Sequence, residues 1–208
     1  SGYLNGGLIF HDVLVETIRH AATGTLDLGI DGVDRLPVTD MASRVNAIQQ
    51  LMGAMKYLPP KQRQQLSGRL LETLGENAPR SLMMSDEQVR ELSRSGMGIG
   101  GHTTHHVILS KLTDDAARDE IDINRNTLSS IIDKPLTSFA YPNGKPGIDY
   151  NASHVKLVRE AGYRNAVSTL SAVGTRQASL HELPRFVLNE TTSIGVVLRM
   201  LRMTAYAI

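Results

Sequence analysis

Residues 98–110 contain three histidines, His102, His105 and His106, directly after a short apolar stretch. Neutral imidazole is the commonest metal ligand in proteins because one ring nitrogen keeps its lone pair near neutral pH. His102 and His106 are four positions apart, so both rings could face one point if the chain turned helically after the preceding strand. The same spacing also occurs in polar loops whose imidazoles are solvated. The pattern therefore predicts either a metal-binding pair or a polar loop, and the surrounding elements must distinguish the two.

The elements around these histidines alternate between helix and strand from about residue 84 onward. We expect strands over residues 97–101, 136–141, 165–169 and 183–188, and helices over residues 85–94, 113–133, 151–160 and 191–204. This alternation predicts parallel strands joined by right-handed crossovers. In such folds functional residues lie on the loops that follow the strands, and His102 and the turn at residues 141–143 both occupy such positions.

Residues 8–80 have a different pattern and no cluster of catalytic residue types. Apolar residues at helical spacing predict helices over residues 10–22, 40–57 and 60–74, and Pro60 suits the first turn of the last of these. Alternation over residues 25–38 around the pair Asp31-Gly32 predicts a β-hairpin. We interpret the whole block as a mainly helical insertion, a cap or lid, in the α/β domain that follows.

The composition excludes several classes of protein and of site. The chain has 208 residues, of which 41% are hydrophobic, and a formal net charge of +1, so we expect a globular protein without a nucleic-acid partner. No apolar run in the sequence approaches the roughly 18 residues needed to span a bilayer. Cysteine is absent, which leaves His, Asp and Glu as metal ligands and is compatible with the cytoplasm or with the periplasm and cell envelope.

Three sequence blocks are recognisable when they are taken together. Residues 85–113, SDEQVRELSRSGMGIGGHTTHHVILSKLT, are followed by SFAYPNGKPG at residues 138–147 and by LPR at residues 183–185. This combination of histidine motif, helix, YPNG turn and LPR strand resembles the polysaccharide deacetylase family, also called the NodB homology fold. The resemblance implies a distorted (β/α) barrel that removes N- or O-acetyl groups from a carbohydrate polymer or oligosaccharide with a divalent metal, commonly zinc.

The resemblance also implies roles for individual residues. The family motif H-S/T-x-x-x-H supplies two metal ligands, which correspond here to His102 and His106, whereas His105 would be a loop side chain. In the family a backbone N–H after the strand helps to bind the oxyanion of the reaction, and this group corresponds to that of Asn143. Arg185 would serve as the cationic partner of an acidic catalytic residue.

Other positions that correspond to the family motifs can be interpreted in two ways. Tyr141 and Pro142 would line the substrate groove or, alternatively, belong to the core. His181 is the candidate for the family's late catalytic histidine, but its sequence context fits poorly and favours a surface residue. The apolar positions of the last helix, among them Ile194 and Leu201, could pack on the barrel or form a contact in a homo-oligomer.

The chain departs from the family pattern at one essential motif, a strand that ends in an Asp-Asp pair and supplies the general base and the third metal ligand. Asp114-Asp115 does not match, because it follows the histidines and begins a predicted helix. We expect the motif to precede Ser1, so that residues 1–7 would continue from a missing N-terminal part of the barrel. Residues 8–80 would then be the insertion and residues 81–208 the deacetylase-like domain, and the fold would be α/β, an incomplete distorted (β/α) barrel of the polysaccharide deacetylase type.

The first hypothesis is therefore a metal-dependent carbohydrate deacetylase that hydrolyses carbon–nitrogen bonds other than peptide bonds. As given, the chain would bind its metal weakly and have little activity, because the general base and one ligand are missing. An alternative is a catalytically degenerate carbohydrate-binding or scaffold domain of the same fold. A third hypothesis is an unrelated α/β protein whose histidines occur by chance.

Overall fold

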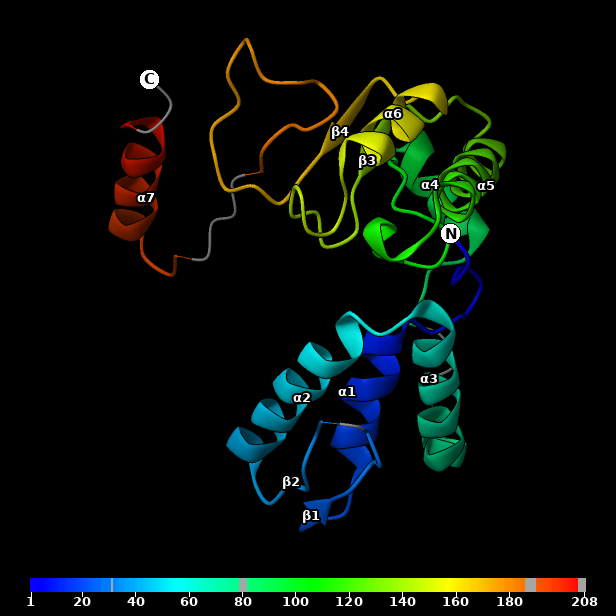
Figure 1. Ribbon diagram of the computed structural model, residues 1–208, viewed down its shortest axis with the longest axis vertical. Helices are drawn as coiled ribbons and strands as arrows, with labels where there is room; N and C mark the ends of the chain where they lie inside the picture. Colours follow the sequence, from blue (N-terminus) through cyan, green and yellow to red (C-terminus); the bar gives the residue numbers. More distant parts are fainter. Residues whose placement is uncertain (31, 79–81, 186–189, 206–208) are drawn as a thin grey trace. The chain divides into compact units, whose positions relative to one another are not determined.

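The computed structural model describes the chain except for residues 31, 79–81, 186–189 and 206–208. It divides into two compact units, one formed by Tyr3–Ser85 and the other by Ser1–Gly2 together with Asp86–Ile208. Figure 1 shows the helices and strands of each unit. None of the described helices has the length and apolar character that crossing a membrane requires.

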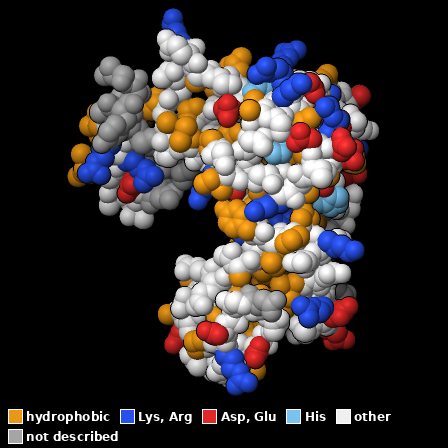
Figure 2. Space-filling view, viewed as in Figure 1, with side chains coloured by type: hydrophobic (Ala, Val, Ile, Leu, Met, Phe, Trp, Pro, Cys, Tyr) orange, Lys and Arg blue, Asp and Glu red, His pale blue; other side chains and the backbone are white. Residues whose placement is uncertain are grey.

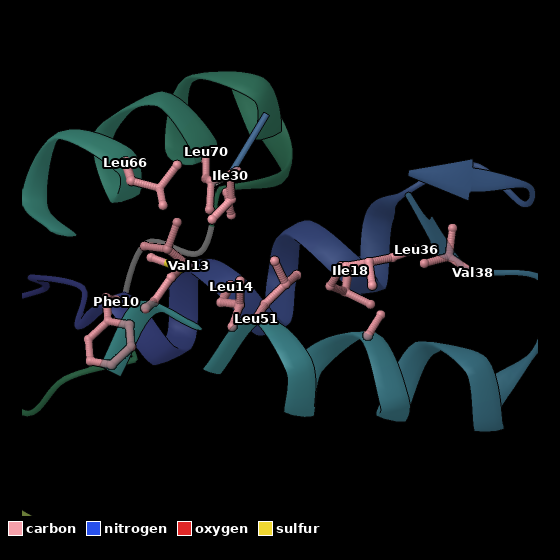
Figure 3. Packing of buried hydrophobic residues seen from close by; sticks show 12 residues of the cluster. Phe10, Val13, Leu14, Ile18, Ile30, Leu36, Val38, Leu51, Leu66 and Leu70 are labelled. Atoms are coloured by element: carbon pink, nitrogen blue, oxygen red, sulfur yellow. The ribbon is translucent and has the colours of Figure 1, made fainter. Parts of the chain in front are cut away.

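The unit Tyr3–Ser85 is mainly helical. It contains α1 (Phe10–His20), β1 (Thr25–Leu26), β2 (Leu36–Pro37), α2 (Met41–Lys56), α3 (Pro60–Leu74) and the 3-10 turn η1 (Gly75–Asn77). In this unit α1 packs against both α2 and α3 (Figure 1). Its buried side chains recur at helical spacing and meet apolar residues of both neighbours, as Figure 3 shows for Val13, Leu14, Ile18, Leu51 and Leu66. Burial of one apolar face on each helix therefore holds this unit together.

The hairpin expected over residues 25–38 is present, but its ladder is short. β1 and β2 pair antiparallel with Leu26 opposite Leu36. The Val33 N–H donates to the Ile30 carbonyl at 3.0 Å, between the two strands. Asp31 itself lies outside the described residues. The structure does not test whether residues 8–80 are an insertion, and that interpretation stays a prediction.

The second unit contains the helices α4 (Asp86–Arg94), α5 (Asp114–Ile132), α6 (Ala152–Glu160) and α7 (Ser193–Ala205), the strands β3 (Ser138–Ala140) and β4 (Asn165–Val167), and the 3-10 turn η2 (Leu109–Lys111). β3 and β4 pair in parallel. Single parallel bridges extend this arrangement on both sides, from Gly101 to Phe139 and from Val167 to Leu183. Four successive segments therefore run parallel, with α5 and α6 as the crossovers between the first three of them.

The outer strands of this set are shorter than the sequence predicts. The expected strand over residues 97–101 is reduced to the bridge at Gly101, because three glycines in that stretch offer no side chains to pack on a sheet face. The expected strand over residues 183–188 is reduced to the bridge at Leu183, and its last three positions lie outside the described residues. No closed barrel forms among the residues that the structure describes, and the unit is an incomplete (β/α) barrel.

The start of α6 contains a buried histidine that takes part in the helix cap. The Asn151 side chain accepts hydrogen bonds from the N–H groups of Ser153 at 2.9 Å and of His154 at 3.3 Å, and the Asn151 N–H donates to His154 Nδ1 at 3.0 Å. His154 is only 2% exposed. Burial lowers the pKa of His154, and the carboxylate of Asp114 only partly opposes this effect. The cap therefore requires the neutral imidazole, because a protonated Nδ1 cannot accept a hydrogen bond.

The stability of this unit should consequently fall in mild acid. As the pH drops below about 6.5, the unfolded chain binds a proton that folded His154 resists, so the free energy of unfolding decreases by at most about 1.4 kcal/mol per pH unit from this group. The variant His154→Gln keeps an acceptor but cannot titrate. Urea unfolding between about pH 7.5 and about pH 5, followed by NMR signals of α6, should show a weaker pH dependence for the variant. Equal pH dependence in the two proteins would contradict the assignment.

Candidate active site

The candidate site begins where the first parallel segment ends. Gly101 is held in the ladder by two hydrogen bonds, from its N–H to the Ser138 carbonyl at 2.9 Å and from the Ala140 N–H to its own carbonyl at 2.8 Å. The next residue, His102, donates from Nδ1 to the Ala140 carbonyl at 2.7 Å. A carbonyl can only accept, so this bond makes Nδ1 the protonated nitrogen and leaves the lone pair on Nε2. His102 thereby has a fixed ring orientation and a defined tautomer.

The structure brings His102 and His106 together. Their ring centroids are 4.8 Å apart and their planes are inclined at 74°, an edge-to-face arrangement. No helical turn brings them together, because Thr103 and His106 have left-handed φ angles of 61° and 50° and the structure has no helix between His102 and Leu109. The rings therefore meet through two left-handed residues in a loop and not through helical periodicity.

This loop conformation is costly for the residues that adopt it. A left-handed backbone costs about 1–2 kcal/mol for a residue with a side chain, and it is least favourable for a β-branched residue such as Thr103. Such a conformation persists only where surrounding contacts determine it. Thr103 is only 1% exposed, so this part of the loop is embedded in the structure.

Two side chains of α5 provide those contacts. Asn124 Oδ1 accepts from the His102 N–H at 3.0 Å, and Asn124 Nδ2 donates to the Thr103 carbonyl at 2.7 Å. One turn earlier, Glu120 Oε2 accepts from the N–H groups of Thr104 at 2.9 Å and of His105 at 2.8 Å, while Oε1 accepts from His105 Nδ1 at 2.6 Å. His105 is thus a loop side chain bound to α5, as expected, and its side chain is 57% exposed.

Sequence reasoning missed Glu120 and Asn124, although one signal was available. The buried residues of α5 are Ala117, Ile121, Asn124, Leu128 and Ile131. A single amide in this otherwise apolar stripe must find partners, since an unpaired buried polar group is costly. The pattern could therefore have indicated that Asn124 binds another part of the chain, but not which part.

The surroundings of His102 favour its neutral form. Burial lowers the pKa of His102, the hydrogen bond to Ala140 acts in the opposite direction, and the positive charge of Arg185 lowers it further. Arg185 Nε donates to the Ser168 carbonyl at 2.7 Å, just beyond the end of β4. The predicted cationic residue therefore acts electrostatically on His102.

Asn143 lies in the turn that follows β3 and also has a left-handed φ, of 59°. Thr169 Oγ1 donates to its carbonyl at 2.7 Å, which ties the turn to the segment after β4. The Asn143 N–H donates to no atom in the described part of the chain. This N–H remains available as a donor, as its predicted role requires.

The other matched residues are structural in this arrangement. Tyr141 is fully buried, stacks on Tyr150 with a centroid distance of 3.8 Å, and donates from its hydroxyl to the His181 carbonyl at 2.9 Å. Pro142 is buried as well. Both residues fit the core interpretation, and neither offers exposed surface to a substrate. His181 Nε2 donates to the Tyr163 carbonyl at 2.9 Å, so this ring is engaged in the fold and is half-buried, not a free surface residue.

The histidine pair brings two imidazole nitrogen donors close together. No group of three or more His, Asp or Glu side chains that could hold a metal ion exists among the described residues. The two imidazoles fit nitrogen ligands of a zinc ion, because His102 is neutral and has its lone pair on the nitrogen that faces away from Ala140. A catalytic zinc site typically has three protein ligands, and this loop brings two imidazoles together.

Comparison with known proteins agrees with this geometry. The model of the polysaccharide deacetylase family matches residues 69–166, a span that includes both histidines, α5, β3 and Asn143. Residues 69–166 are therefore similar to the polysaccharide deacetylase family. The deacetylase match ends before Arg185, so the role expected for that residue has no support from it.

Individual relatives show how much of the deacetylase fold the chain contains. The protein YxkH of Bacillus subtilis (strain 168), whose name describes it as a polysaccharide deacetylase, is 26% identical over 102 residues, which are 49% of this chain and 35% of YxkH. The structure of the Streptococcus pyogenes deacetylase PplD, solved with acetate, is similar with a TM-score of 0.51 at 22% identity, over 63% of this chain and 54% of PplD. The chain thus spans about a third of YxkH and about half of PplD, and the likeness to PplD shows the fold.

Replacement of Gly101 should destabilise the unit that contains His102 more than replacement of a nearby glycine. A Cβ at position 101 would lie 2.2 Å from Tyr163 Oη and 2.8 Å from Asn124 Oδ1, distances that require both buried side chains to move. We expect Gly101→Ala to lower the free energy of unfolding by about 1–3 kcal/mol and to change the amide NMR signal of His102.

Gly98→Ala is the matched control, because a Cβ at position 98 has no neighbour within 4 Å. This control should leave both the unfolding free energy and the His102 amide signal nearly unchanged. Equal effects of the two substitutions would show that the close approach at Gly101 is not required.

Proposed function

We propose that this chain carries the histidine half of the active site of a metal-dependent carbohydrate deacetylase, which hydrolyses N-acetyl groups of a sugar polymer or oligosaccharide. The observation that carries the proposal is the convergence of His102 and His106 beside the carboxyl end of β3, inside the region that matches the family. The catalytic residues of (β/α) barrels lie at this end of the strands.

The metal in this proposal is a divalent cation, with zinc preferred by the two imidazole nitrogens. When bound, it would lower the pKa of a coordinated water and polarise the carbonyl of the acetyl group. His102 and His106 would hold it. The third ligand and the general base would be carboxylates outside the described residues, because the described part of the chain contains no group of three ligating side chains.

Asn143 would act on the substrate, Thr169 would support Asn143, and Arg185 would act on the charge of a neighbouring carboxylate. As water attacks the acetyl carbonyl, negative charge develops on its oxygen, and the Asn143 N–H is the donor that this chain offers to it. A single such donor is worth about 3–4 kcal/mol in a preorganised site. Thr169 helps to hold the Asn143 turn through its hydrogen bond to the Asn143 carbonyl. Arg185 would favour the ionised form of the carboxylate that completes the site.

A catalytically degenerate carbohydrate-binding or scaffold domain is the second candidate. It is favoured by one observation, the lack of a third His, Asp or Glu ligand among the described residues. The distribution of charge supports a neutral partner such as a carbohydrate over a nucleic acid, because acidic and basic side chains are interspersed on the face shown in Figure 2. Location in the cytoplasm or the cell envelope and assembly into a homo-oligomer stay predictions.

Zinc binding by the histidine pair can be measured on the chain itself. In a titration of the ¹⁵N-labelled chain with Zn²⁺, the ring signals of His102 and His106 should shift together, with weak affinity because two ligands hold the ion. His106→Ala should abolish the shift of His102, whereas the control His20→Ala, on α1, should not change it. A zinc-independent His102 signal, or binding that survives His106→Ala, would contradict the proposed site.

Release of amine from acetylated chito-oligosaccharide in the presence of Zn²⁺ tests the chemistry. We expect little or no turnover by these 208 residues, because the described residues provide no general base, and robust turnover would show this expectation to be wrong. The same assay on a longer natural protein containing the chain separates the two candidates. Turnover would support the deacetylase, and its absence would support the degenerate domain.

A further inference from the structure

We infer that Glu120 and Asn124 are positioning residues for the histidine pair, and that they set the loop of residues 102–106 in the conformation that binds the metal. This inference rests on the proposed function, since it assigns to two side chains of α5 the preorganisation of that site. Neither residue is a candidate metal ligand. Each acts through the backbone between the two histidines.

The two side chains hold four polar backbone groups at the start of the loop. Asn124 bonds the His102 N–H and the Thr103 carbonyl, and Glu120 bonds the N–H groups of Thr104 and His105. The Thr104 hydroxyl adds a fifth hydrogen bond, to the Glu120 carbonyl at 3.2 Å. Because Glu120 and Asn124 are four residues apart on one helix, they lie on the same face of α5 and contact successive peptide groups.

These bonds select one backbone conformation from several. A Thr residue at φ 61° is disfavoured unless its neighbours determine it. Asn124 binds the N–H of the preceding residue, His102, and the carbonyl of Thr103 itself. An amide can do this because it donates and accepts at once. If Thr103 relaxed to an ordinary φ, the direction of the following peptides would change and His106 would lose its position beside His102.

The His102 and His106 rings are each oriented by a different set of contacts. His102 is fixed independently by its hydrogen bond to Ala140. The path from His102 to His106 is fixed by α5, through Asn124 at its beginning and Glu120 at its middle. Loss of either α5 side chain should therefore leave His102 in place and allow His106 to move. Substitution of a group that orients metal ligands typically weakens metal binding by about 10–100-fold.

The test uses two nearly isosteric substitutions, each with a charge-matched control on the same helix. Asn124→Asp keeps the acceptor for the His102 N–H but replaces the donor to Thr103 with a second acceptor, and Asn126→Asp introduces the same charge at an exposed position. Glu120→Gln removes one of the two carboxylate oxygens as an acceptor, and Asp119→Asn removes the same charge at an exposed position. If Asn124→Asp prevents folding, the comparison of Glu120→Gln with Asp119→Asn decides the question alone.

The first measurement needs no metal. The nuclear Overhauser contacts between the His102 and His106 rings, and the N–H to Hα couplings of Thr103 and His106, report the ring pair and the left-handed φ angles. We expect both to change in Asn124→Asp and Glu120→Gln and to persist in the controls, under conditions where circular dichroism shows each protein folded. Unchanged ring contacts and couplings in both test variants would overturn the inference.

The second measurement is the dissociation constant for Zn²⁺ alone, from the His102 ring signal. We expect roughly tenfold weaker binding in the test variants than in their controls. A purely structural role would lower the unfolding midpoint and leave the zinc affinity of the folded protein unchanged, and that outcome would also overturn the inference. If the wild-type rings do not respond to Zn²⁺, the proposed function is wrong, and the metal-free measurement alone decides whether α5 sets the histidine pair.

Discussion

The close approach of α5 to the backbone at Gly101 is the constraint on which the candidate site depends. With no side chain at position 101, Asn124 and the hydroxyl of Tyr163 can occupy the space beside the chain immediately before His102. Asn124 then reaches both the His102 N–H and the Thr103 carbonyl. A larger residue at position 101 would displace the group that determines the left-handed Thr103. The geometry of the histidine pair thus depends on the packing of α5 against the first parallel segment.

The site is assembled at one end of the parallel segments, and each segment contributes through its backbone. The first ends at Gly101 and presents His102, β3 ends at Ala140 and leads to Asn143, and the segment after β4 holds Arg185 through the Ser168 carbonyl. Hydrogen bonds between these connections, such as that from Thr169 to Asn143, tie neighbouring turns together. Incomplete closure of the barrel therefore does not prevent the local assembly of this half of the site.

The helices were predictable because their signals are local. Pro60 begins α3, Thr113 caps α5 and Asn151 caps α6, and apolar residues at helical spacing fill the buried faces between the ends. The strands were predictable in order and direction but not in length, because pairing depends on neighbours that the sequence does not show. The family resemblance indicated residues 102 and 106. Their spacing alone would bring the two rings together only if the chain turned helically, and the structure brings them together through a loop instead.

The parts of the site that sequence reasoning missed depend on tertiary contacts. Glu120 looks like an ordinary acidic residue of a solvated helix face, and its three acceptor bonds to the loop follow only from the packing of α5. The left-handed conformations of Thr103 and Asn143 were equally hidden, because neither position carries a glycine that would signal a positive φ. Asn124 was the exception, since its place in an apolar stripe was visible in the sequence.

The electrostatics of the described residues favour a site that is completed by negative charge. Imidazoles in their neutral form bind a divalent cation without neutralising it, and the nearby charge of Arg185 that acts on His102 is positive. This charge would repel a cation in a partly buried environment, where screening by water is weak. A carboxylate placed between the metal and Arg185 would turn the repulsion into attraction on both sides, because it would be stabilised by the metal and by the guanidinium together. The charge described beside the histidine pair is therefore better complemented by a carboxylate than by a further cationic group.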